Sequence, residues 1–185
     1  MDDLANRLQK QQISPEFKPG ADGVPSRSAA RVVVIAADGR VLLARGHDAL
    51  DTARAWWFTI GGGMEPGEDT RQAAARELAE ETGIQVTPES LEGPVLTRDS
   101  EFVFSSITVR QHETFYLLRV EHASELDDSR WTELERSVVD ELAWITPAAL
   151  QASPVTQYPR DLAKRLEEWV TGWDGTCPHL VENGE

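Results

Sequence analysis

The chain of 185 residues contains one cysteine, Cys177, and therefore cannot form an internal disulfide. A lone thiol fits a reducing compartment. The sequence also lacks an apolar run near 18 residues, which a membrane-spanning helix would need. Its first ten residues are polar and charged, unlike a secretory signal peptide. We therefore expect a cytoplasmic protein that has no membrane partner.

Positive charge is also scarce. The chain has 18 Lys and Arg against 32 Asp and Glu, which gives a net charge of −14 and a pI of about 4.7. This excess argues against nonspecific binding to nucleic acid or to an anionic membrane, because both are themselves negatively charged. Lys and Arg are scattered along the sequence and form no basic patch. We therefore expect no nucleic-acid partner, and phosphate groups would need metal ions or local arginines.

The length and the composition, 40% hydrophobic and 27% charged, fit one globular domain. Residues 1–28 are predicted to be an N-terminal extension, with a short helix over 2–12 followed by a turn-rich linker. This extension could be disordered or could pack on a partner subunit, so a homodimer stays open. We place the domain at residues 29–172 and a C-terminal tail at 173–185.

The domain is predicted to open with a β-hairpin. Residues 29–36 are mainly apolar, Asp38-Gly39 suits a hairpin turn, and residues 40–45 return. A continuous apolar run of this kind indicates a strand buried on both faces. The later predicted elements are a polar loop at 46–55, a strand at 56–60, a second hairpin from 101–109 and 113–120, a helix at 131–139, a final strand at 141–145, and helices at 147–151 and 160–170.

The most informative stretch is a glycine turn, residues 61–63, that leads into a predicted helix over 70–82. Glycine lets the backbone bend sharply and approach a ligand closely. The helix residues are good helix formers, and Asp69 or Thr70 can cap its start. Gly83 follows where a left-handed C-terminal residue is favoured. The turn and the helix are therefore expected to form one continuous loop-helix unit.

Three carboxylates share one face of this helix, because Glu77, Glu80 and Glu81 stand at positions i, i+3 and i+4. Like charges at this spacing repel by roughly 0.2–0.5 kcal/mol per pair, and the C-terminal end of a helix is itself negative. A solvated acidic face is the ordinary explanation of such a pattern. Mg²⁺, however, takes oxygen ligands and is commonly shared between protein carboxylates and substrate phosphates.

The same stretch resembles the signature of the Nudix hydrolases, and every constrained position is filled. The matching positions are Gly62, Glu68, Arg76-Glu77-Leu78, Glu80-Glu81 and Gly83-Ile84. The resemblance implies an α/β fold, an α/β/α sandwich with a mixed β-sheet, in which these residues form a loop-helix-loop beside the sheet. Ile60 stands where the family often has a proline, a departure that leaves the signature intact.

The resemblance also implies the roles of several residues. Glu80 and Glu81, assisted by Glu77 and Glu68, would bind Mg²⁺ or Mn²⁺. Arg76 would orient the carboxylates, because a fixed guanidinium can hold a carboxylate through two hydrogen bonds.

The attacking water still needs a general base. Glu81 or Glu77 could act as that base, while Glu113 and Glu141 could also reach the site. The predicted substrate contacts are Gly62, Gly63, Arg45 and Arg54, with Arg31 as a further phosphate contact.

Three aromatic residues, Trp56, Trp57 and Phe58, could stack on a base, although aromatic residues in a strand more often pack in a core.

We therefore expect a divalent-metal-dependent hydrolase. Its substrate would be a small-molecule nucleotide, a nucleoside diphosphate linked to another group, as in ADP-ribose, a nucleotide sugar or a nucleoside triphosphate. The alternative is a non-catalytic module that senses a nucleotide. The complete set of carboxylates favours the enzyme, because a pure binding module would not need them.

Overall fold

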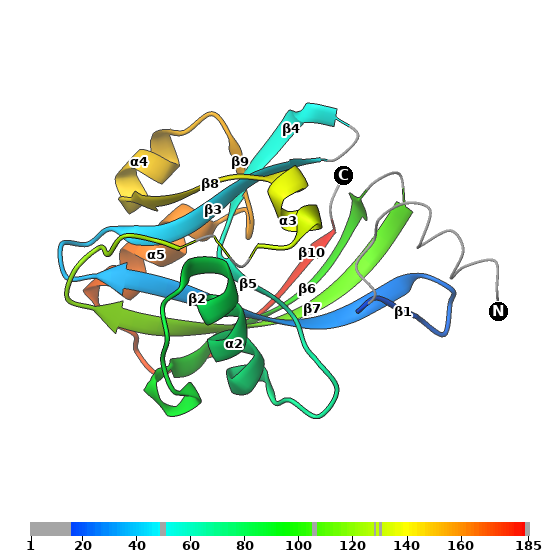
Figure 1. Cartoon of the computed structure of the whole chain (residues 1–185), viewed down its shortest axis with the longest axis horizontal. Helices are drawn as coiled ribbons and strands as arrows, with labels where there is room; N and C mark the ends of the chain where they lie inside the picture. Colours follow the sequence, from blue (N-terminus) through cyan, green and yellow to red (C-terminus); the bar gives the residue numbers. More distant parts are fainter. Residues whose placement is uncertain (1–15, 49–50, 105–106, 128, 130, 184–185) are drawn as a thin grey trace.

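The computed structural model describes residues 16–48, 51–104, 107–127, 129 and 131–183 (Figure 1). The predicted helix over residues 2–12 lies outside this part. The elements in chain order are β1 (Lys18–Pro19), β2 (Pro25–Ala36), β3 (Val41–Asp48), β4 (Asp51–Phe58), β5 (Ile60–Gly63), α2 (Thr70–Thr82), the 3₁₀ helix η1 (Pro88–Ser90), β6 (Glu92–Phe104), β7 (Ile107–Val120), α3 (Glu133–Val138), β8 (Val139–Ile145), α4 (Pro147–Ala152), β9 (Thr156–Gln157), α5 (Leu162–Thr171) and β10 (His179–Asn183).

One mixed sheet organises the molecule. Its strands follow the order β10-β6-β7-β2-β3-β4-β9, with β1 and β5 also paired to β2 and β8 paired to β3. The pairings of β2 with β7, β6 with β10 and β4 with β9 are parallel, and the others are antiparallel. The predicted mixed sheet is therefore confirmed.

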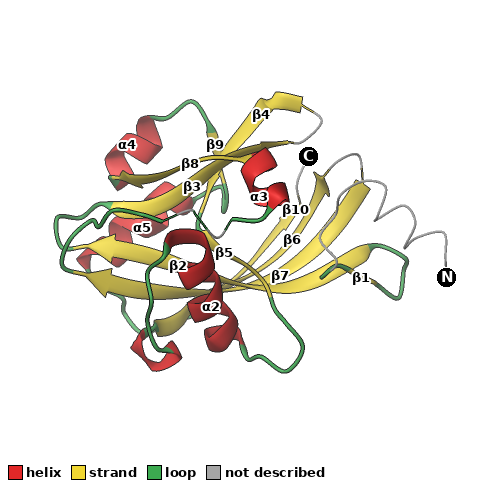
Figure 2. Ribbon diagram, viewed as in Figure 1, coloured by secondary structure: helices red, strands yellow, loops and turns green. Residues whose placement is uncertain are grey.

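Helices cover both faces of the sheet (Figure 2). Val32 and Val34 of β2 pack in a core with Ala74 and Leu78 of α2. Val33 belongs to a second core, which also contains Leu150 of α4 and Leu166 and Trp169 of α5. Because alternate residues of a strand point to opposite faces, β2 supplies both cores and is buried on both sides. This arrangement confirms the α/β/α layering.

The predicted first hairpin is confirmed, with Val34 opposite Leu42 and Ile35 opposite Val41. The predicted polar loop over 46–55 is wrong, because β3 continues to Asp48 and β4 begins at Asp51. Both strands of this hairpin contain polar side chains, and the first half of β4, where its polar residues lie, is exposed. An exposed strand does not need the apolar pattern that identifies a buried strand.

The second hairpin is present but longer than predicted. Strand β6 runs from Glu92 to Phe104 and pairs with residues 107–117 of β7, so the predicted gap at 110–112 is part of a strand. Gln111 and Glu113 are buried there despite being polar, which hid the strand from a search for apolar residues. The predicted helices at 147–151 and 160–170 are confirmed, while the predicted helix at 131–139 is shorter.

The C-terminal segment contains a strand that the sequence did not indicate. Strand β10 pairs in parallel with β6, with His179 opposite Thr97. The strand over residues 141–145 is therefore not the last one. Inside the predicted extension, β1 pairs with β2, which already begins at Pro25. The division at residues 29 and 172 stays a prediction. Among the described residues, no helix is long and apolar enough to span a membrane.

Candidate active site

Helix α2 starts and ends where its capping residues place it. The side chain of Asp69 accepts hydrogen bonds from the backbone N–H groups of Arg71 and Gln72, both at 2.9 Å, so Asp69 rather than Thr70 is the cap. The Gln72 side chain accepts from the Asp69 N–H in return, which completes a capping box. Gly83 ends the helix in the left-handed conformation, with φ of 76°. These caps fix the direction in which the glutamates of α2 point.

The glycine turn lies directly against this helix. Residues 61–63, for which we keep the name glycine turn, belong to strand β5 and do not form the predicted turn. Strand β5 pairs with β2 so that Gly62 is opposite Ala30. A Cβ on Gly61 would come within 2.1 Å of the Ala30 carbonyl oxygen. A Cβ on Gly62 would come within 2.7 Å of a carboxylate oxygen of Glu77. Only glycine therefore lets the turn approach both the sheet and the Glu77 carboxylate this closely.

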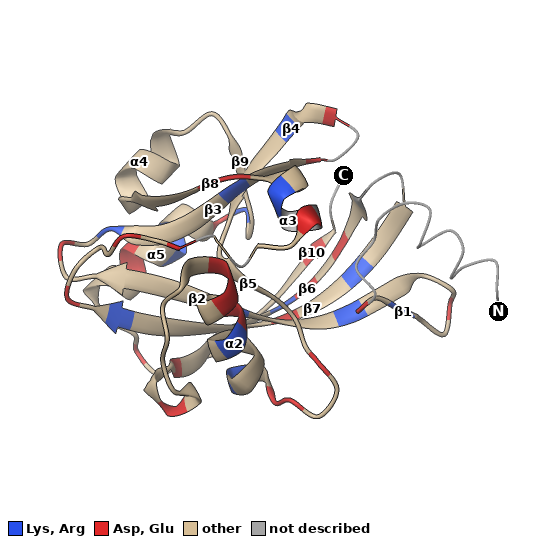
Figure 3. Cartoon of the chain, viewed as in Figure 1, with Lys and Arg blue, Asp and Glu red and all other residues tan. Residues whose placement is uncertain are grey.

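Arg76 connects the carboxylates of this site. Its guanidinium donates to Glu68 at 2.7 and 3.0 Å, to Glu77 at 2.8 Å and to Glu80 at 2.9 Å. It also donates to the Gly63 carbonyl oxygen at 2.9 Å. The hydrogen bond from Arg76 is the main cause that lowers the pKa of Glu68. One arginine thus holds three carboxylates and the end of the glycine turn together. Figure 3 shows that acidic and basic residues follow one another along α2.

Glu77 is the buried member of the cluster, with 7% of the residue exposed. Burial raises the pKa of Glu77 to about 7, although the hydrogen bond and the positive charge of Arg76 act in the opposite direction. The negative charges of Glu16 and Glu80 raise this pKa further. The ion pair with Arg76 alone would lower it, so the loss of hydration outweighs the ion pair. Glu77 is therefore a carboxyl that changes its charge near neutral pH.

Glu81 supports the turn from the other side. Its side chain accepts a hydrogen bond from the Gly61 N–H at 2.9 Å, and its carbonyl oxygen accepts from the Trp131 indole at 2.8 Å. Glu80 is exposed. The predicted shared face therefore contains three different environments, in which Glu77 is buried, Glu81 is half-buried and Glu80 faces solvent.

The donor set of this site fits a hard divalent cation. Glu77 and Glu80 each place a carboxylate oxygen within 2.9 Å of the same nitrogen of Arg76. Three carboxylates, those of Glu68, Glu77 and Glu80, contact this one guanidinium, and the Glu81 carboxylate accepts from the Gly61 N–H of the adjoining turn. Oxygen is the ligand that Mg²⁺ prefers. Within the described ranges, no three metal-ligating side chains are already gathered around one point. Carboxylates that now contact Arg76 would have to turn toward the ion.

Glu113 does not belong to this site, and the hypothesis that it could act as the base is wrong. It is 1% exposed and accepts hydrogen bonds from Arg31, Arg98 and Gln111. Burial raises the pKa of Glu113, but the positive charges and hydrogen bonds of Arg31 and Arg98 outweigh it and hold this pKa below its usual value. Arg31 is likewise no phosphate contact, because its guanidinium also donates to the Gly61 and Thr59 carbonyl oxygens. Both residues support the glycine turn from behind.

The other predicted contacts lie on β3, β4 and β8. Arg45 approaches Glu141 at 3.5 Å across the β3–β8 pair, and Arg54 lies 3.9 Å from Asp48. The structure does not connect them to the glycine turn, and their substrate contacts stay predictions. Trp57 is buried in one core and Phe58 packs against the other, while Trp56 is half-buried and makes an edge contact with Tyr158. Stacking of Trp56 on a base stays a prediction.

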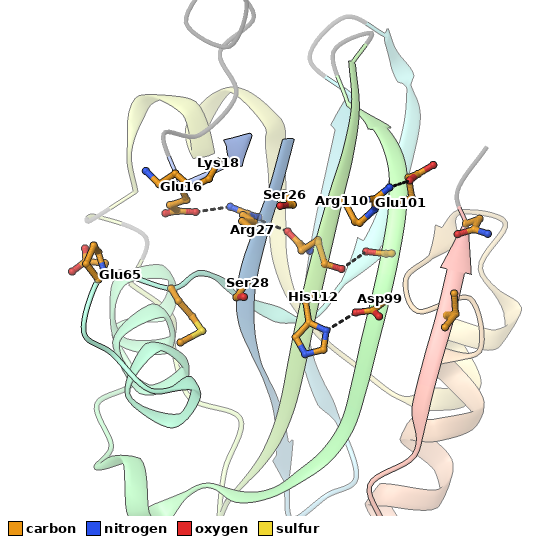
Figure 4. A pocket seen from close by; sticks show the side chains of 16 residues that line it. Glu16, Lys18, Ser26, Arg27, Ser28, Glu65, Asp99, Glu101, Arg110 and His112 are labelled. Atoms are coloured by element: carbon orange, nitrogen blue, oxygen red, sulfur yellow. Dashed lines mark hydrogen bonds and ion pairs between the residues drawn. The ribbon is translucent and has the colours of Figure 1, made fainter. Parts of the chain in front are cut away.

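Sequence reasoning missed Glu16, which precedes β1 in the predicted extension. A Cβ on Gly63 would overlap the Glu16 carboxylate, which forms an ion pair with Arg27 at 2.6 Å. Glu16 also lines a cavity of about 1050 Å³ beside the glycine turn, which we name the turn-side cavity (Figure 4). No pattern in the sequence marks this residue, because it reaches the turn through the fold.

Comparisons with known proteins agree with this geometry. The family model described as NUDIX domain matches residues 25–166. An RNA pyrophosphohydrolase of Dinoroseobacter shibae is 27% identical over 158 residues, which cover 81% of this chain and 94% of the relative. A CTP pyrophosphohydrolase of Escherichia coli is 48% identical over 54 residues, 29% of this chain and 39% of the relative. The chain thus spans about two-fifths of the length of the relatives that it matches with higher identity.

Solved structures show the same fold. The dihydroneopterin triphosphate pyrophosphohydrolase of E. coli superposes with a TM-score of 0.55 at 25% identity and covers 85% of this chain and 99% of its own. The MutT protein of Methanosarcina mazei gives a TM-score of 0.57 at 20% identity, over 78% of this chain and 95% of its own. With the family model matching most of the chain and the signature residues gathered at one turn, this protein belongs to the Nudix family.

Proposed function

We propose that this protein is a divalent-metal-dependent pyrophosphohydrolase. It cleaves the pyrophosphate linkage of a nucleoside diphosphate that carries a further group. The observation that supports this proposal is a cluster of four glutamates at the glycine turn: Arg76 ties Glu68, Glu77 and Glu80 to the Gly63 carbonyl oxygen, and Glu81 accepts from the Gly61 N–H. Glu77 is buried against the backbone of Gly62. Such a cluster stabilises the fold poorly without a cation, since buried carboxylates lose their hydration.

Glu77, Glu80 and Glu81, with Glu68 nearby, would hold Mg²⁺ or Mn²⁺. A metal bound there would lower the pKa of a water molecule and neutralise charge on the phosphate oxygens. The residues of the chain do the rest. Arg76 keeps the carboxylates oriented, and the glycine turn lets the backbone come close to a phosphate group.

The proton of the attacking water has two candidate acceptors. Glu77 has a pKa of about 7 in the metal-free protein. A bound cation would favour its carboxylate form, which could then accept the proton. Glu81 is the other candidate, although it also holds the Gly61 N–H. Glu141 lies beside Arg45 on β8 and remains the more distant alternative.

The reaction balances as hydrolysis of an anhydride. The water oxygen bonds to phosphorus, the bridging P–O bond breaks, and the leaving phosphate keeps the electron pair while the water proton passes to a carboxylate. ADP-ribose would give AMP and ribose 5-phosphate, and a nucleoside triphosphate would give a monophosphate and pyrophosphate. Two of the relatives are named RNA pyrophosphohydrolase and CTP pyrophosphohydrolase, so RNA and CTP both belong in the substrate panel.

The test is hydrolysis in ¹⁸O-labelled water with Mg²⁺ or Mn²⁺, followed by mass spectrometry of the products. We expect the label in a phosphate group. Label found only on a sugar hydroxyl would mean glycosidic cleavage and would overturn the assignment to phosphorus chemistry. Tight nucleotide binding without turnover of any substrate in the panel would instead favour a sensing module.

A further inference from the structure

The turn-side cavity has the position and the size of a second part of the substrate site. Met64, Glu65 and Pro66, which follow the glycine turn, form one wall, and Val181 and Asn183 of β10 lie on another. Between them β2, β7 and β6 run side by side (Figure 4). Small-molecule sites are typically clefts of about 300–1,000 Å³, so a volume of about 1050 Å³ can hold a sugar-sized group and its water.

Glu16 connects this cavity to the carboxylate cluster. Its side chain lies so close to Gly63 that a Cβ there would come within 1.9 Å of a Glu16 oxygen. Its negative charge also acts on Glu77. The cavity wall thus includes Glu16, which lies against Gly63, and Met64, which directly follows the turn. A group attached to a diphosphate at the turn can reach the cavity without leaving the protein.

The charged residues of the cavity wall are engaged with one another. Arg27 contacts Glu16 and Gln111, both at 2.6 Å, and Arg110 contacts Glu101 at 2.8 Å. The wall contains four carboxylates and three cationic side chains. This balance offers no surplus of positive charge for further phosphate groups. A substrate group that carries several further phosphates would therefore bind poorly in this cavity.

The remaining chemistry of the wall suits hydroxyl groups. Ser26, Ser28, Ser100 and Asn183 are neutral hydrogen-bonding residues, and they alternate with carboxylates and guanidinium groups. A hydroxyl both donates and accepts, so it can bond to a carboxylate and to a guanidinium at once. Among the described residues that line the cavity there is no Phe, Tyr or Trp on which a base could stack, and the one aromatic ring there, that of His112, is paired with Asp99.

We propose that the turn-side cavity binds the group attached to the diphosphate, and that this group is neutral and rich in hydroxyls, such as a hexose or a ribose. The proposal rests on the pyrophosphohydrolase function and selects nucleoside diphosphate sugars from its substrate range. Glu16, Ser28 and Asn183 would then be residues that determine specificity.

The first experiment compares kcat/KM of the full chain, with Mn²⁺, for UDP-glucose and ADP-ribose against UTP and ATP. We expect at least a tenfold preference for the sugar nucleotides. Equal or faster hydrolysis of the triphosphates would overturn the cavity proposal and leave the pyrophosphohydrolase function intact. Isothermal titration calorimetry of the metal-free protein with UDP-glucose and with UDP tests the cavity proposal independently of the pyrophosphohydrolase function. If nothing is hydrolysed, tighter binding of UDP-glucose would still support the cavity, and equal binding would contradict it.

The second experiment fills the cavity. Ser28 is exposed on β2 and lines the cavity, so Ser28→Phe should lower kcat/KM for UDP-glucose at least tenfold more than for UTP. Thr108→Phe is the matched control, because Thr108 is an exposed strand residue outside the cavity wall, and neither rate should change. If Ser28→Phe does not fold, Asn183→Phe fills the cavity from the opposite wall. An equal loss for both substrates would show that the cavity does not select the attached group.

Discussion

Arg31 donates a hydrogen bond to Glu113 at 2.8 Å and, with the other side of its guanidinium, to the carbonyl oxygen of Gly61. Glu113 in turn accepts from Arg98, which reaches Glu182 of β10 at 2.7 Å. A buried chain of charges therefore runs from the C-terminal strand to the back of the glycine turn. The turn is held in place by residues that never face the substrate.

This relationship predicts that Glu113→Gln destabilises the fold strongly. The change leaves the Arg31 guanidinium without its counter-charge and leaves Arg98 with Glu182 alone. Breaking a buried ion pair costs about 3–5 kcal/mol. Glu101→Gln, on the same hairpin, is the matched control. The pair of Glu101 with Arg110 is exposed, so its loss should cost less than about 1 kcal/mol. Urea unfolding of both variants measures the difference, and similar midpoints would show that the buried chain contributes little.

The raised pKa of Glu77 predicts a pH dependence of stability. A carboxyl whose pKa rises from its ordinary value to about 7 on folding favours the folded state while it is protonated. That contribution is complete below about pH 4, near the unfolded pKa, and is lost as the pH rises through about 7. In the metal-free wild type, titration of Glu77 should lower the free energy of unfolding by on the order of 3 kcal/mol between these two pH values. Glu77→Gln should abolish this decrease. Parallel stability curves for the two proteins would mean that Glu77 titrates normally.

Metal binding should reverse this effect. A cation at the carboxylates competes with the proton on Glu77, so Mg²⁺ should raise the melting temperature more at pH 8 than at pH 5. Thermal unfolding with and without EDTA measures the shift, and activity should disappear in excess EDTA. The Glu77→Gln variant controls for metal bound elsewhere. Full turnover in EDTA, or a shift that is equal at both pH values, would contradict a metal site at this cluster.

Glu81→Gln should remove most turnover, on the order of 10²–10⁴-fold, while the fold remains. Glutamine retains an oxygen that can accept the Gly61 N–H, so the glycine turn should keep its position. The lost charge removes a metal ligand or a base. Glu81→Ala provides the comparison, because it also loses the hydrogen bond and should lower the melting temperature as well. A wild-type rate for Glu81→Gln would show that Glu81 is neither ligand nor base.

The part of the site that local sequence determines was predictable. Asp69 and Gly83 mark the ends of α2 through capping geometry, which depends on a few neighbouring residues. Arg76, Glu77, Glu80 and Glu81 then follow from helical spacing. Burial differs among them, however, and it depends on the turn and the sheet packed against the helix. The sequence alone could not show that Glu77 is buried while Glu80 is exposed.

The rest of the site depends on contacts between distant segments. Glu113 meets Arg31 across 82 positions of the chain, and β10 pairs with residues of β6 that are equally distant in sequence. The hydrophobic periodicity of the sequence does not indicate the pairing of β10 with β6, because β10 is short and partly exposed. Polar residues on such strands therefore have the sequence pattern of a loop or a tail. The contact of Glu16 with the glycine turn is also one between segments that are distant in sequence.

Gly62→Ala gives the sharpest test of the contact between the turn and the helix. Gly62 does not have a positive φ, so alanine meets no backbone strain there, but its Cβ would lie 2.7 to 2.9 Å from the Glu77 carboxyl group. Crowding of this kind costs about 1–3 kcal/mol and would move Glu77 away from its partners. In the Glu77→Ala background the added methyl group has room, so the destabilisation should largely disappear, a coupling of roughly 0.5–3 kcal/mol. Urea unfolding of the wild type, both single variants and the double variant measures this coupling. Additive effects would mean that the turn does not rest on Glu77, and the buried carboxylate would then need another explanation for its raised pKa.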